Sequence, residues 1–430
     1  MLGYEKPRRR LPFDAHQYWQ QRQSKRNQRA RAELATVGNA DGLTFEKAFS
    51  RDRLYACWEQ LKLKNGPAPG VDGITFDDVS PFELGQIAGM VSTAVLNGRY
   101  RPHPTRPVKI PKTSSGWRTL QIGILADRMV AKAFNIAVQS LLEEVYLDGS
   151  WGFRIGRSPL AMLADMEARM IKNDCWVLTV DDIANAFDNV PIDRTMSAFK
   201  KLLNKHAKLL NQHANRLPDT GDYLQLLEVI LKGSNPDRLI GIDQGNPVSP
   251  SALNALLQVN HDTPLEQSGT LWLRYADNLA YVTKSVSEGQ QALCQARDLL
   301  SHVGMTLKGP GYSTNLATGD TALLGLILRK RDNCLQLTTG NLAWIKLDSV
   351  LEQAHESSNP HEAASAAMDG WMEACGFAFE SGEDVVREVL QRASQHGFHE
   401  VSRETVRGGW NSSHRRWQEC RRAAMGRYGL

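Results

Sequence analysis

Two apolar segments that each end in a carboxylate constrain the fold of this chain more than any other feature. Residues 176–180 lead into Asp182, and residues 271–276 lead into Asp277. Both segments have the β-branched and aromatic composition of strands. A carboxylate at the exit of a buried strand is costly unless it is paired or bound to a metal. Neighbouring strands of one sheet would place these two acids, ninety-five positions apart, on one pair of divalent cations.

The second carboxylate lies between two strand-like runs, residues 271–273 and 279–282. Asp277 and Asn278 fall at the centre of the predicted hairpin, because both residue types tolerate positive φ. Taken alone, the segment would be explained better as an ordinary β-turn.

The composition is that of a globular protein of two to three domains, with 430 residues of which 42% are hydrophobic and 23% charged. The six cysteines include no Cys-x-x-Cys pair, so we expect reduced thiols. We find neither a signal-peptide pattern nor an apolar run of the roughly 20 residues that a membrane span requires. The sequence therefore predicts a cytoplasmic protein that does not enter membranes.

Charge is distributed unevenly. Residues 1–31 carry a net charge of +7 and residues 401–430 a net charge of +5, whereas the whole chain carries only +4. Tryptophans are interspersed with both basic ends, a pattern that suits phosphate neutralisation and base stacking. The alternative is that these arginines lie on solvated helix faces.

Periodicity predicts the main elements. Helices are expected over residues 45–63, 80–96, 126–146, 160–172, 194–217, 222–232, 251–260 and 287–303. Strands are expected over residues 176–182, 270–276, 279–283 and 323–328, with two further β-like runs within 100–121. After Gly340 the pattern is helical to the end, which indicates a domain boundary. Ser80 is predicted to cap its helix, and Ser249 and Pro250 are predicted to cap and open another.

In their order along the chain these motifs resemble a reverse transcriptase palm. In that family an aspartate is followed five positions later by an aromatic residue, as Asp182 is here by Phe187. A second motif has an aromatic residue, any residue and two acids, and here it ends in Asp277 and Asn278. Residues 70–73, 110–118 and 152–158 resemble the fingers of group II intron-type enzymes. The resemblance spans about residues 65–330 and includes six motifs.

The resemblance implies an α+β right-hand polymerase. Residues 1–64 would form a basic N-terminal extension and helix, and residues 65–175 the fingers. Residues 176–338 would form the palm, an antiparallel sheet with helices. Residues 339–430 would form an all-helical thumb with a basic C-terminus.

The resemblance also implies a two-metal site. Asp182, Asp277 and the backbone carbonyl of Ile183 would hold two Mg²⁺ ions, or Mn²⁺ in their place. Asn278 would belong to the catalytic residues as well. It removes one negative charge from the family pattern while keeping an oxygen that can face a cation, so we expect weaker metal affinity or a changed metal preference. Lys308 would protonate the departing pyrophosphate.

Other residues are predicted to bind nucleotide and nucleic acid. Those implied to contact the incoming deoxynucleotide are Lys112, Arg118, Ile183, Phe187, Gln244 and Gly245. Phe187 would exclude a 2′ hydroxyl, although it is also typical of a core phenylalanine. Those implied to contact template, primer or duplex are Arg154, Arg157, Gly325, Arg415, Arg416 and Arg421. A plain structural turn is the alternative for the first two.

The sequence therefore predicts an RNA-directed DNA polymerase that copies a dedicated noncoding RNA into a DNA/RNA hybrid from dNTPs. By analogy with solitary bacterial reverse transcriptases of the unknown groups, we expect a role in antiphage defence. The alternatives are a group II intron-type enzyme that also acts as a maturase, and an RNA-binding scaffold with weakened catalysis. Template identity, priming mode and oligomeric state stay open.

Overall fold

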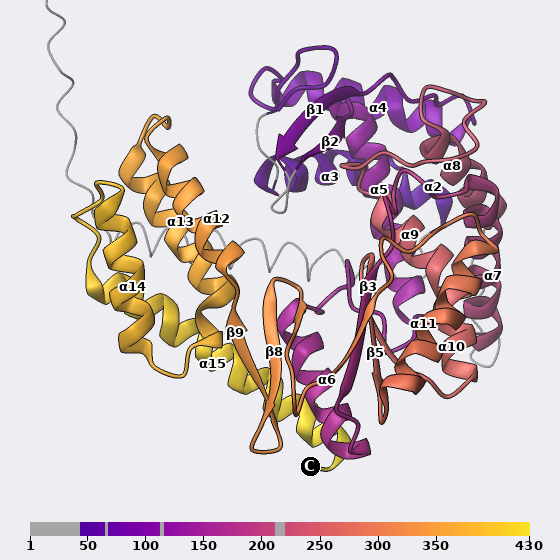
Figure 1. The fold of residues 1–430 in the computed structure, drawn as a ribbon. Helices are drawn as coiled ribbons and strands as arrows, with labels where there is room; N and C mark the ends of the chain where they lie inside the picture. The colour runs from indigo at the N-terminus through magenta and orange to yellow at the C-terminus, as the bar shows by residue number, and fades with distance from the viewer. Residues whose placement is uncertain (1–43, 65–67, 112–115, 211–219) are drawn as a thin grey trace, which may run out of the picture. The chain divides into compact units, whose positions relative to one another are not determined.

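The computed structural model describes residues 44–64, 68–111, 116–210 and 220–430 (Figure 1). They form two compact units, one of residues 44–336 with 420–430 and one of residues 337–419. Helices and antiparallel strands both occur, so the predicted α+β class is confirmed. None of the described helices combines the length and apolar composition that a membrane crossing needs.

The larger unit is built around a four-stranded antiparallel sheet with the order β4-β5-β3-β6. The strands are β3 (Val177–Asp182), β4 (Leu271–Tyr275), β5 (Asn278–Thr283) and β6 (Tyr312–Asn315). The first four residues of β3 are buried, as its continuous apolar run predicts. Helix α11 (Val286–Ser301) packs on β3, β5 and β6, and α6 (Pro159–Asn173) packs on β4 (Figure 1).

The remaining helices of this unit share one apolar core with the sheet. They are α2 (Phe45–Ala48), α3 (Arg51–Lys64), α4 (Pro81–Leu96), α5 (Leu125–Glu143), α7 (Ile192–Leu210), α8 (Thr220–Lys232), α9 (Ser249–Leu257), the π-helix η1 (Gln258–Asp262) and α10 (Thr263–Gln267). The predicted cap of α4 is confirmed, because the Ser80 hydroxyl accepts from Glu83 N while the Glu83 carboxylate accepts from Ser80 N. The predicted cap of α9 is wrong. Val248 occupies that position, and the Ser249 hydroxyl donates to Asp243 O (2.7 Å).

Two smaller β structures complete this unit. One is the hairpin of β1 (Arg106–Pro111) and β2 (Trp117–Ile122), and the other is the sheet of β7 (Thr321–Leu323), β8 (Leu326–Arg331) and β9 (Cys334–Thr339). The single strand predicted over 323–328 is wrong. Leu324 and Gly325, with φ of +52° and +83°, form a two-residue turn inside it.

The unit of residues 337–419 is helical, which confirms the pattern predicted after Gly340. Its helices are α12 (Asn341–Ala354), α13 (Pro360–Cys375), the short 3₁₀ helix η2 (Gly376–Ala378), α14 (Gly382–Gln395) and most of α15 (Arg403–Tyr428). They enclose an apolar core of their own, which includes Leu351, Trp371 and Val389. The fingers, palm and thumb boundaries given above stay predictions.

Glu167 on α6 fastens two segments of the larger unit. Its buried carboxylate accepts hydrogen bonds from Leu335 N in β9 (2.9 Å) and from Nε and Nη2 of Arg421 in α15 (2.6 and 2.8 Å). One carboxylate thus holds both stretches of chain, residues 334–336 and 420–430, that adjoin the unit of residues 337–419.

Glu167→Gln should lower the free energy of unfolding by about 3 kcal/mol, because removing one partner of a buried ion pair leaves the other charge without compensation. Urea denaturation of the full chain measures this loss. Glu373→Gln is the matched control, since its pair with Arg416 is more exposed and such pairs contribute roughly 0–1 kcal/mol. Equal losses for the two variants would contradict the anchoring role of Glu167.

Candidate active site

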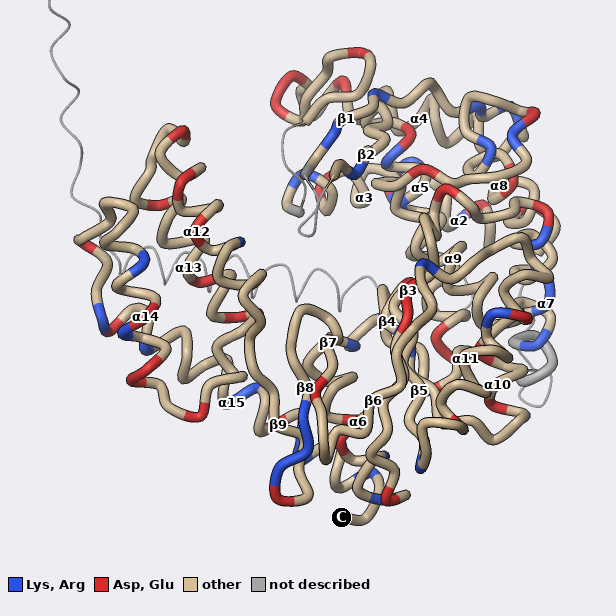
Figure 2. The backbone as a smooth tube through the Cα atoms, in the orientation of Figure 1, with Lys and Arg blue, Asp and Glu red and all other residues tan. Residues whose placement is uncertain are grey.

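The exit of β3 meets the turn between β4 and β5. Asp182, the last residue of β3, is the ladder partner of Asn278, the first residue of β5. Ile183 N donates to Asp277 O (2.9 Å). Acidic residues mark this end of β3 (Figure 2). The structure therefore brings together the two strand exits that carry Asp182 and Asp277.

The turn that carries Asp277 is tight. Tyr275 pairs with Asn278, so Ala276 and Asp277 are its two central residues. Ala276 adopts φ +59°, a conformation that favours glycine and costs other residues roughly 1–2 kcal/mol. The predicted turn centre at Asp277 and Asn278 is therefore wrong by one residue, because Asn278 joins the ladder opposite Asp182.

A third segment borders Asp182 on its other side. Ala184 N donates to Thr306 O (2.8 Å), and Lys308 N donates to Asp182 O (2.7 Å). Lys308 Nζ lies 3.7 Å from Asp182 Oδ2. The predicted acid and the predicted proton donor are thus neighbours.

Electrostatics at Asp182 favour a cation. Its side chain is 40% exposed. Partial burial, and after it the charge of Asp277, raise the pKa of Asp182, while Lys308 lowers it less strongly. A carboxylate whose ionisation is disfavoured by a neighbouring negative charge is stabilised when a divalent cation lies between the two groups.

The oxygen donors fit a hard cation. They are the carboxylates of Asp182 and Asp277 and the carbonyl of Ile183, to which no backbone amide donates within the described part of the chain. Asn278 Nδ2 donates to Tyr275 O and Asp277 Oδ1, both at 3.4 Å, so the amide turns its nitrogen toward Asp277. A third acid in its place would repel that carboxylate instead.

Asp181 does not supply the missing acid. Side chains alternate along β3, so Asp181 faces away from Asp182, and its Oδ1 accepts from Gly309 N (3.3 Å). Among the residues that the structure describes, no group of three or more acid, histidine or cysteine side chains forms a metal site.

The predicted nucleotide-binding segments lie side by side. Gln121 N in β2 donates to Gln244 O (2.7 Å), and Arg118 is exposed three residues earlier in the same strand. Gly245 has φ +106°, and a Cβ there would lie 3.2 Å from Gln121 O. Lys112 lies outside the described residues. Binding of nucleotide by these residues stays a prediction.

Phe187 follows the exit of β3 and adjoins the loop of Gln244. Its carbonyl accepts from Ile242 N (2.9 Å), two residues before that glutamine. The ring is half-buried against the core and meets the ring of Phe153 edge-on, with centroids 6.3 Å apart. Phe187 thus has one side in the core and one side open to solvent, which is compatible with both of its predicted roles.

The prediction that Arg154 binds phosphate is wrong. Its side chain is only 3% exposed, and its guanidinium donates to the Glu143 carboxylate (2.9 Å) and to the carbonyls of Leu147 and Ser150. Arg157 pairs with Asp148 (2.8 Å), so its contact with nucleic acid stays a prediction.

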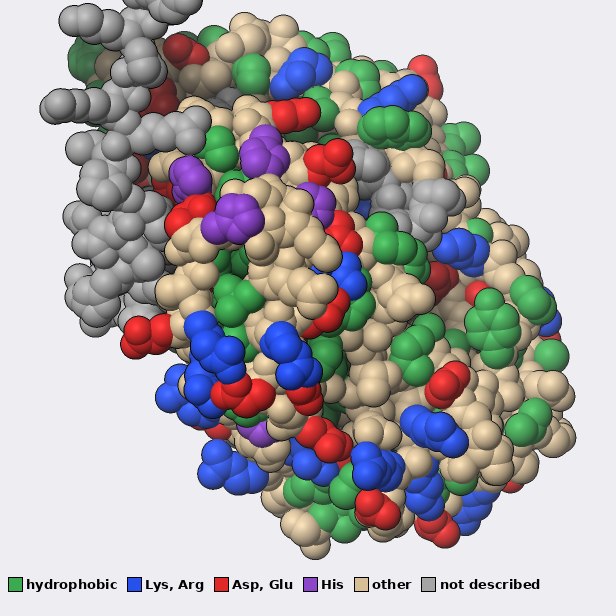
Figure 3. Space-filling model, turned by 60° about the vertical axis from the view of Figure 1, so that its left-hand side comes forward, with side chains coloured by type: hydrophobic (Ala, Val, Ile, Leu, Met, Phe, Trp, Pro, Cys, Tyr) green, Lys and Arg blue, Asp and Glu red, His purple; other side chains and the backbone are tan. Residues whose placement is uncertain are grey.

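The arginines of α15 differ from one another. Arg421 pairs with the buried carboxylate of Glu167 and keeps part of its side chain exposed, so its contact with duplex stays a prediction. Arg416 pairs with Glu373, and Arg415 is exposed. Basic side chains stand next to acidic ones on the face shown in Figure 3.

Gly325 lies in an exposed turn, and apart from its two chain neighbours no described residue has an atom within 4 Å of where a Cβ would be. A close approach of the primer at this glycine stays a prediction.

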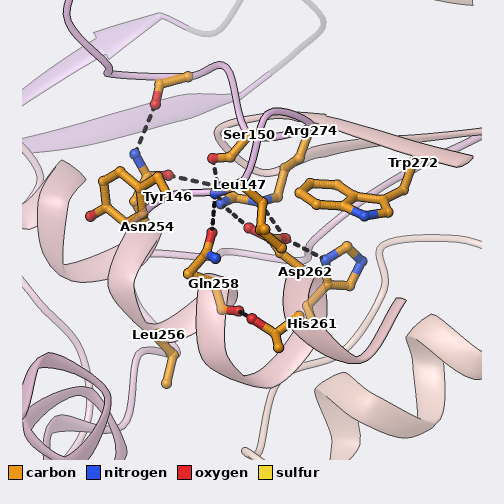
Figure 4. Close-up of polar contacts among 12 residues, drawn as sticks. Tyr146, Leu147, Ser150, Asn254, Leu256, Gln258, His261, Asp262, Trp272 and Arg274 are labelled. Atoms are coloured by element: carbon orange, nitrogen blue, oxygen red, sulfur yellow. Dashed lines mark hydrogen bonds and ion pairs between the residues drawn. The ribbon is translucent and has the colours of Figure 1, made fainter. Parts of the chain in front are cut away.

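Sequence reasoning missed a buried polar cluster behind the turn of Asp277 (Figure 4). Its members are Ser150, Asn254, His261, Asp262 and Arg274. The available signal was an arginine inside the apolar run of residues 271–276 and a His-Asp pair in an apolar helix. Charges at such positions are buried only when they are paired.

Comparison with known proteins agrees with this geometry. Residues 110–309 match the family model described as Reverse transcriptase (RNA-dependent DNA polymerase). That range contains Asp182, Asp277, Lys308 and the Gln244 loop. Residues 110–309 of this chain are thus similar to reverse transcriptases.

Similar proteins include Protein YkfC of Escherichia coli, 27% identical over 46% of this chain and 50% of that protein. Group II intron-encoded protein LtrA of Lactococcus lactis is 29% identical over 32% of this chain and 22% of its own length. The apo telomerase of Candida tropicalis has a TM-score of 0.43 at 10% identity and covers 76% of this chain and 67% of its own. The chain thus spans half or less of the two curated relatives. Reverse transcriptases generally use divalent metal ions.

Asp182→Asn should raise the melting temperature of the metal-free protein at neutral pH. Folding raises the pKa of this carboxyl above 3.8, so its ionised form destabilises the folded state. The gain should be absent below pH 3.8, grow as the pH rises through the raised pKa, and then level off.

Thermal unfolding at a series of pH values in chelator measures this gain. Asp332→Asn, at an exposed hairpin tip, is the control and should show no such rise. A loss of stability in Asp182→Asn at neutral pH would contradict the electrostatic account of the site.

Proposed function

We propose that this protein is an RNA-directed DNA polymerase that joins deoxynucleotides to a primer on an RNA template. The observation that carries the proposal is the pairing of the β3 exit with the β4–β5 turn, which sets Asp182 beside Asp277 within a reverse transcriptase-family region. Fold similarity alone would not support an activity.

The carboxylates of Asp182 and Asp277 and the carbonyl of Ile183 would hold two Mg²⁺ ions, and the same oxygens suit Mn²⁺. Bound cations of this kind activate the attacking 3′ hydroxyl and stabilise charge on the triphosphate. Arg118, exposed on β2, contacts the triphosphate. Lys308, beside Asp182, donates a proton to the departing pyrophosphate.

The template is a dedicated noncoding RNA, the product is a DNA/RNA hybrid, and the setting is antiphage defence in the cytoplasm. Support comes from the likeness to solitary bacterial reverse transcriptases and from Asn278 at the second acid position. Two other functions have a specific observation in their favour. Similarity to LtrA favours an intron-encoded enzyme with maturase activity. Asn278 favours a scaffold whose palm binds RNA without catalysis.

Sequencing the RNA that copurifies with the protein distinguishes these settings. One short structured RNA encoded beside the gene supports the defence role, and an enclosing intron RNA supports the maturase. A random sample of cellular RNA contradicts both dedicated partners.

Asp182→Ala and Asp277→Ala should each reduce nucleotide incorporation to background, because either change removes a carboxylate from the cation site. The assay uses the purified chain, a primed RNA template, dNTPs, and Mg²⁺ or Mn²⁺ in parallel. Asp332→Ala, far along the chain at an exposed tip, should retain full activity. Incorporation that survives Asp182→Ala would refute the metal assignment, and a wild-type protein inactive with both ions would favour the scaffold.

Phe187→Ala should raise the use of ribonucleotides relative to deoxynucleotides, since the open side of the ring would no longer crowd a 2′ hydroxyl. Competition between rNTP and dNTP in the same assay measures the ratio. Phe153→Ala removes the neighbouring ring and should leave the ratio unchanged. An unchanged ratio in Phe187→Ala, with folding intact, would assign this residue to the core.

A further inference from the structure

We propose that the buried cluster around Arg274 positions Asp277 for metal binding, with Arg274, Asp262 and Asn254 as positioning residues. The inference rests on the proposed function and extends it to residues that touch neither metal nor nucleotide. Figure 4 shows the cluster, in which side chains from β4, α9 and η1 converge with Ser150.

Arg274 is 0% exposed, yet all five of its N–H groups have acceptors. Nε donates to Asp262 Oδ1 (3.1 Å), and Nη2 donates to Asp262 Oδ2 (2.7 Å) and Ser150 Oγ (2.8 Å). Nη1 donates to Asn254 Oδ1 (2.8 Å) and Ala276 O (3.1 Å). A fully satisfied guanidinium has one orientation, so its contact with the turn is fixed.

Asp262 supplies the balancing charge. Burial acts to raise its pKa, but the charge of Arg274 and the hydrogen bonds from His261 and Arg274 outweigh burial and lower the pKa to about 2. The carboxylate is thus ionised. His261 links it to Tyr281, with Nδ1 2.7 Å from Asp262 Oδ1 and Nε2 2.9 Å from the Tyr281 hydroxyl. Tyr281 belongs to β5, so the cluster spans both strands of the hairpin.

The π-helix η1 aligns the acceptors. Asn254 and Asp262 are eight residues apart, and in a regular α-helix they would lie roughly 80° apart around the axis. The wider turn of η1 (Gln258–Asp262) takes up this rotation, so both side chains reach one guanidinium.

Two contacts connect the fixed side chains of Arg274 and Asn254 to the turn of Asp277. The first is the bond from Arg274 Nη1 to Ala276 O. The second runs through Asn254, whose Nδ2 donates to Gly152 O (2.8 Å), and Gly152 lies so close to the turn that a Cβ there would be 2.2 Å from Ala276 N. Ala276 therefore keeps its φ of +59° between two fixed neighbours, and Asp277 follows directly.

A role in stability alone would not require these connections. A buried ion pair adds little stability compared with apolar side chains of similar volume. The contacts of Arg274 and Asn254 with Ala276 and Gly152 instead determine the conformation of the residue before a metal-binding acid. Supporting residues of this kind tune metal affinity in other proteins.

Arg274→Lys tests the inference, because lysine keeps the charge but cannot fill five acceptor positions. Asn254→Ala is a milder second variant that leaves the Arg274–Asp262 pair in place. Mn²⁺ titration of the full chain, followed by electron paramagnetic resonance, measures the Kd without requiring activity. The Mn²⁺ that Asp182→Ala still binds is the Mn²⁺ bound at other places on the protein. We expect the Kd to rise about 10- to 100-fold in Arg274→Lys and less in Asn254→Ala.

Leu227→Ala, in the core on α8, is the control for a loss of stability. Such a loss lowers the number of binding sites but leaves the Kd of the folded molecules unchanged. An unchanged Kd in Arg274→Lys and Asn254→Ala would overturn the positioning role. Equal Mn²⁺ binding by Asp182→Ala and the wild type would instead overturn the proposed function, so the two failures are distinguishable.

Discussion

The hydrogen bond from Ile183 N to Asp277 O is the contact on which the candidate site depends. It extends the β3–β5 ladder by one residue and fixes two acids from distant parts of the chain at adjoining positions. Partial burial, and after it the charge of Asp277, raise the pKa of Asp182. Asn278, opposite Asp182, lessens this repulsion by turning an N–H group rather than a carboxylate toward Asp277. Asn278 in place of an acid thus reduces the negative charge beside Asp277 even without a metal.

The region behind the turn is organised for rigidity. Arg154, with its partner Glu143, fixes the loop from Gly149 to Arg157, and that loop presses Gly152 against the turn. Arg154, which the sequence predicted to bind phosphate, is therefore buried and supports this loop. Lys308, in contrast, is exposed, and its Nζ lies 3.7 Å from Asp182 Oδ2. Packed support behind the acids is the arrangement expected of a site that must hold cations in fixed positions.

Local patterns in the sequence predicted local structure well. The apolar run of β3, the capping box of α4 and the helical pattern after Gly340 each depend on neighbours within a few residues. Two errors were themselves local, the cap of α9 and the turn at Leu324 and Gly325. Contacts between distant segments were beyond reach: Arg421 pairs with Glu167, 254 residues away along the chain, which no local pattern encodes. The turn centre was misplaced because Ala276 adopts a positive φ that only its tertiary contacts explain.

The stability that the region around Asp277 gives up bears on whether the proposed site is catalytic. Three features each lower the stability of the metal-free protein relative to simpler alternatives: a strained Ala276, an Asp182 whose ionisation is opposed by burial and by the charge of Asp277, and a buried guanidinium with its carboxylate. A scaffold that only binds RNA would gain stability from glycine at 276 and an apolar pair at 262 and 274. All three features lie next to Asp277, where the proposed metal site would use them, and they support the proposal of a catalytic polymerase over that of a scaffold.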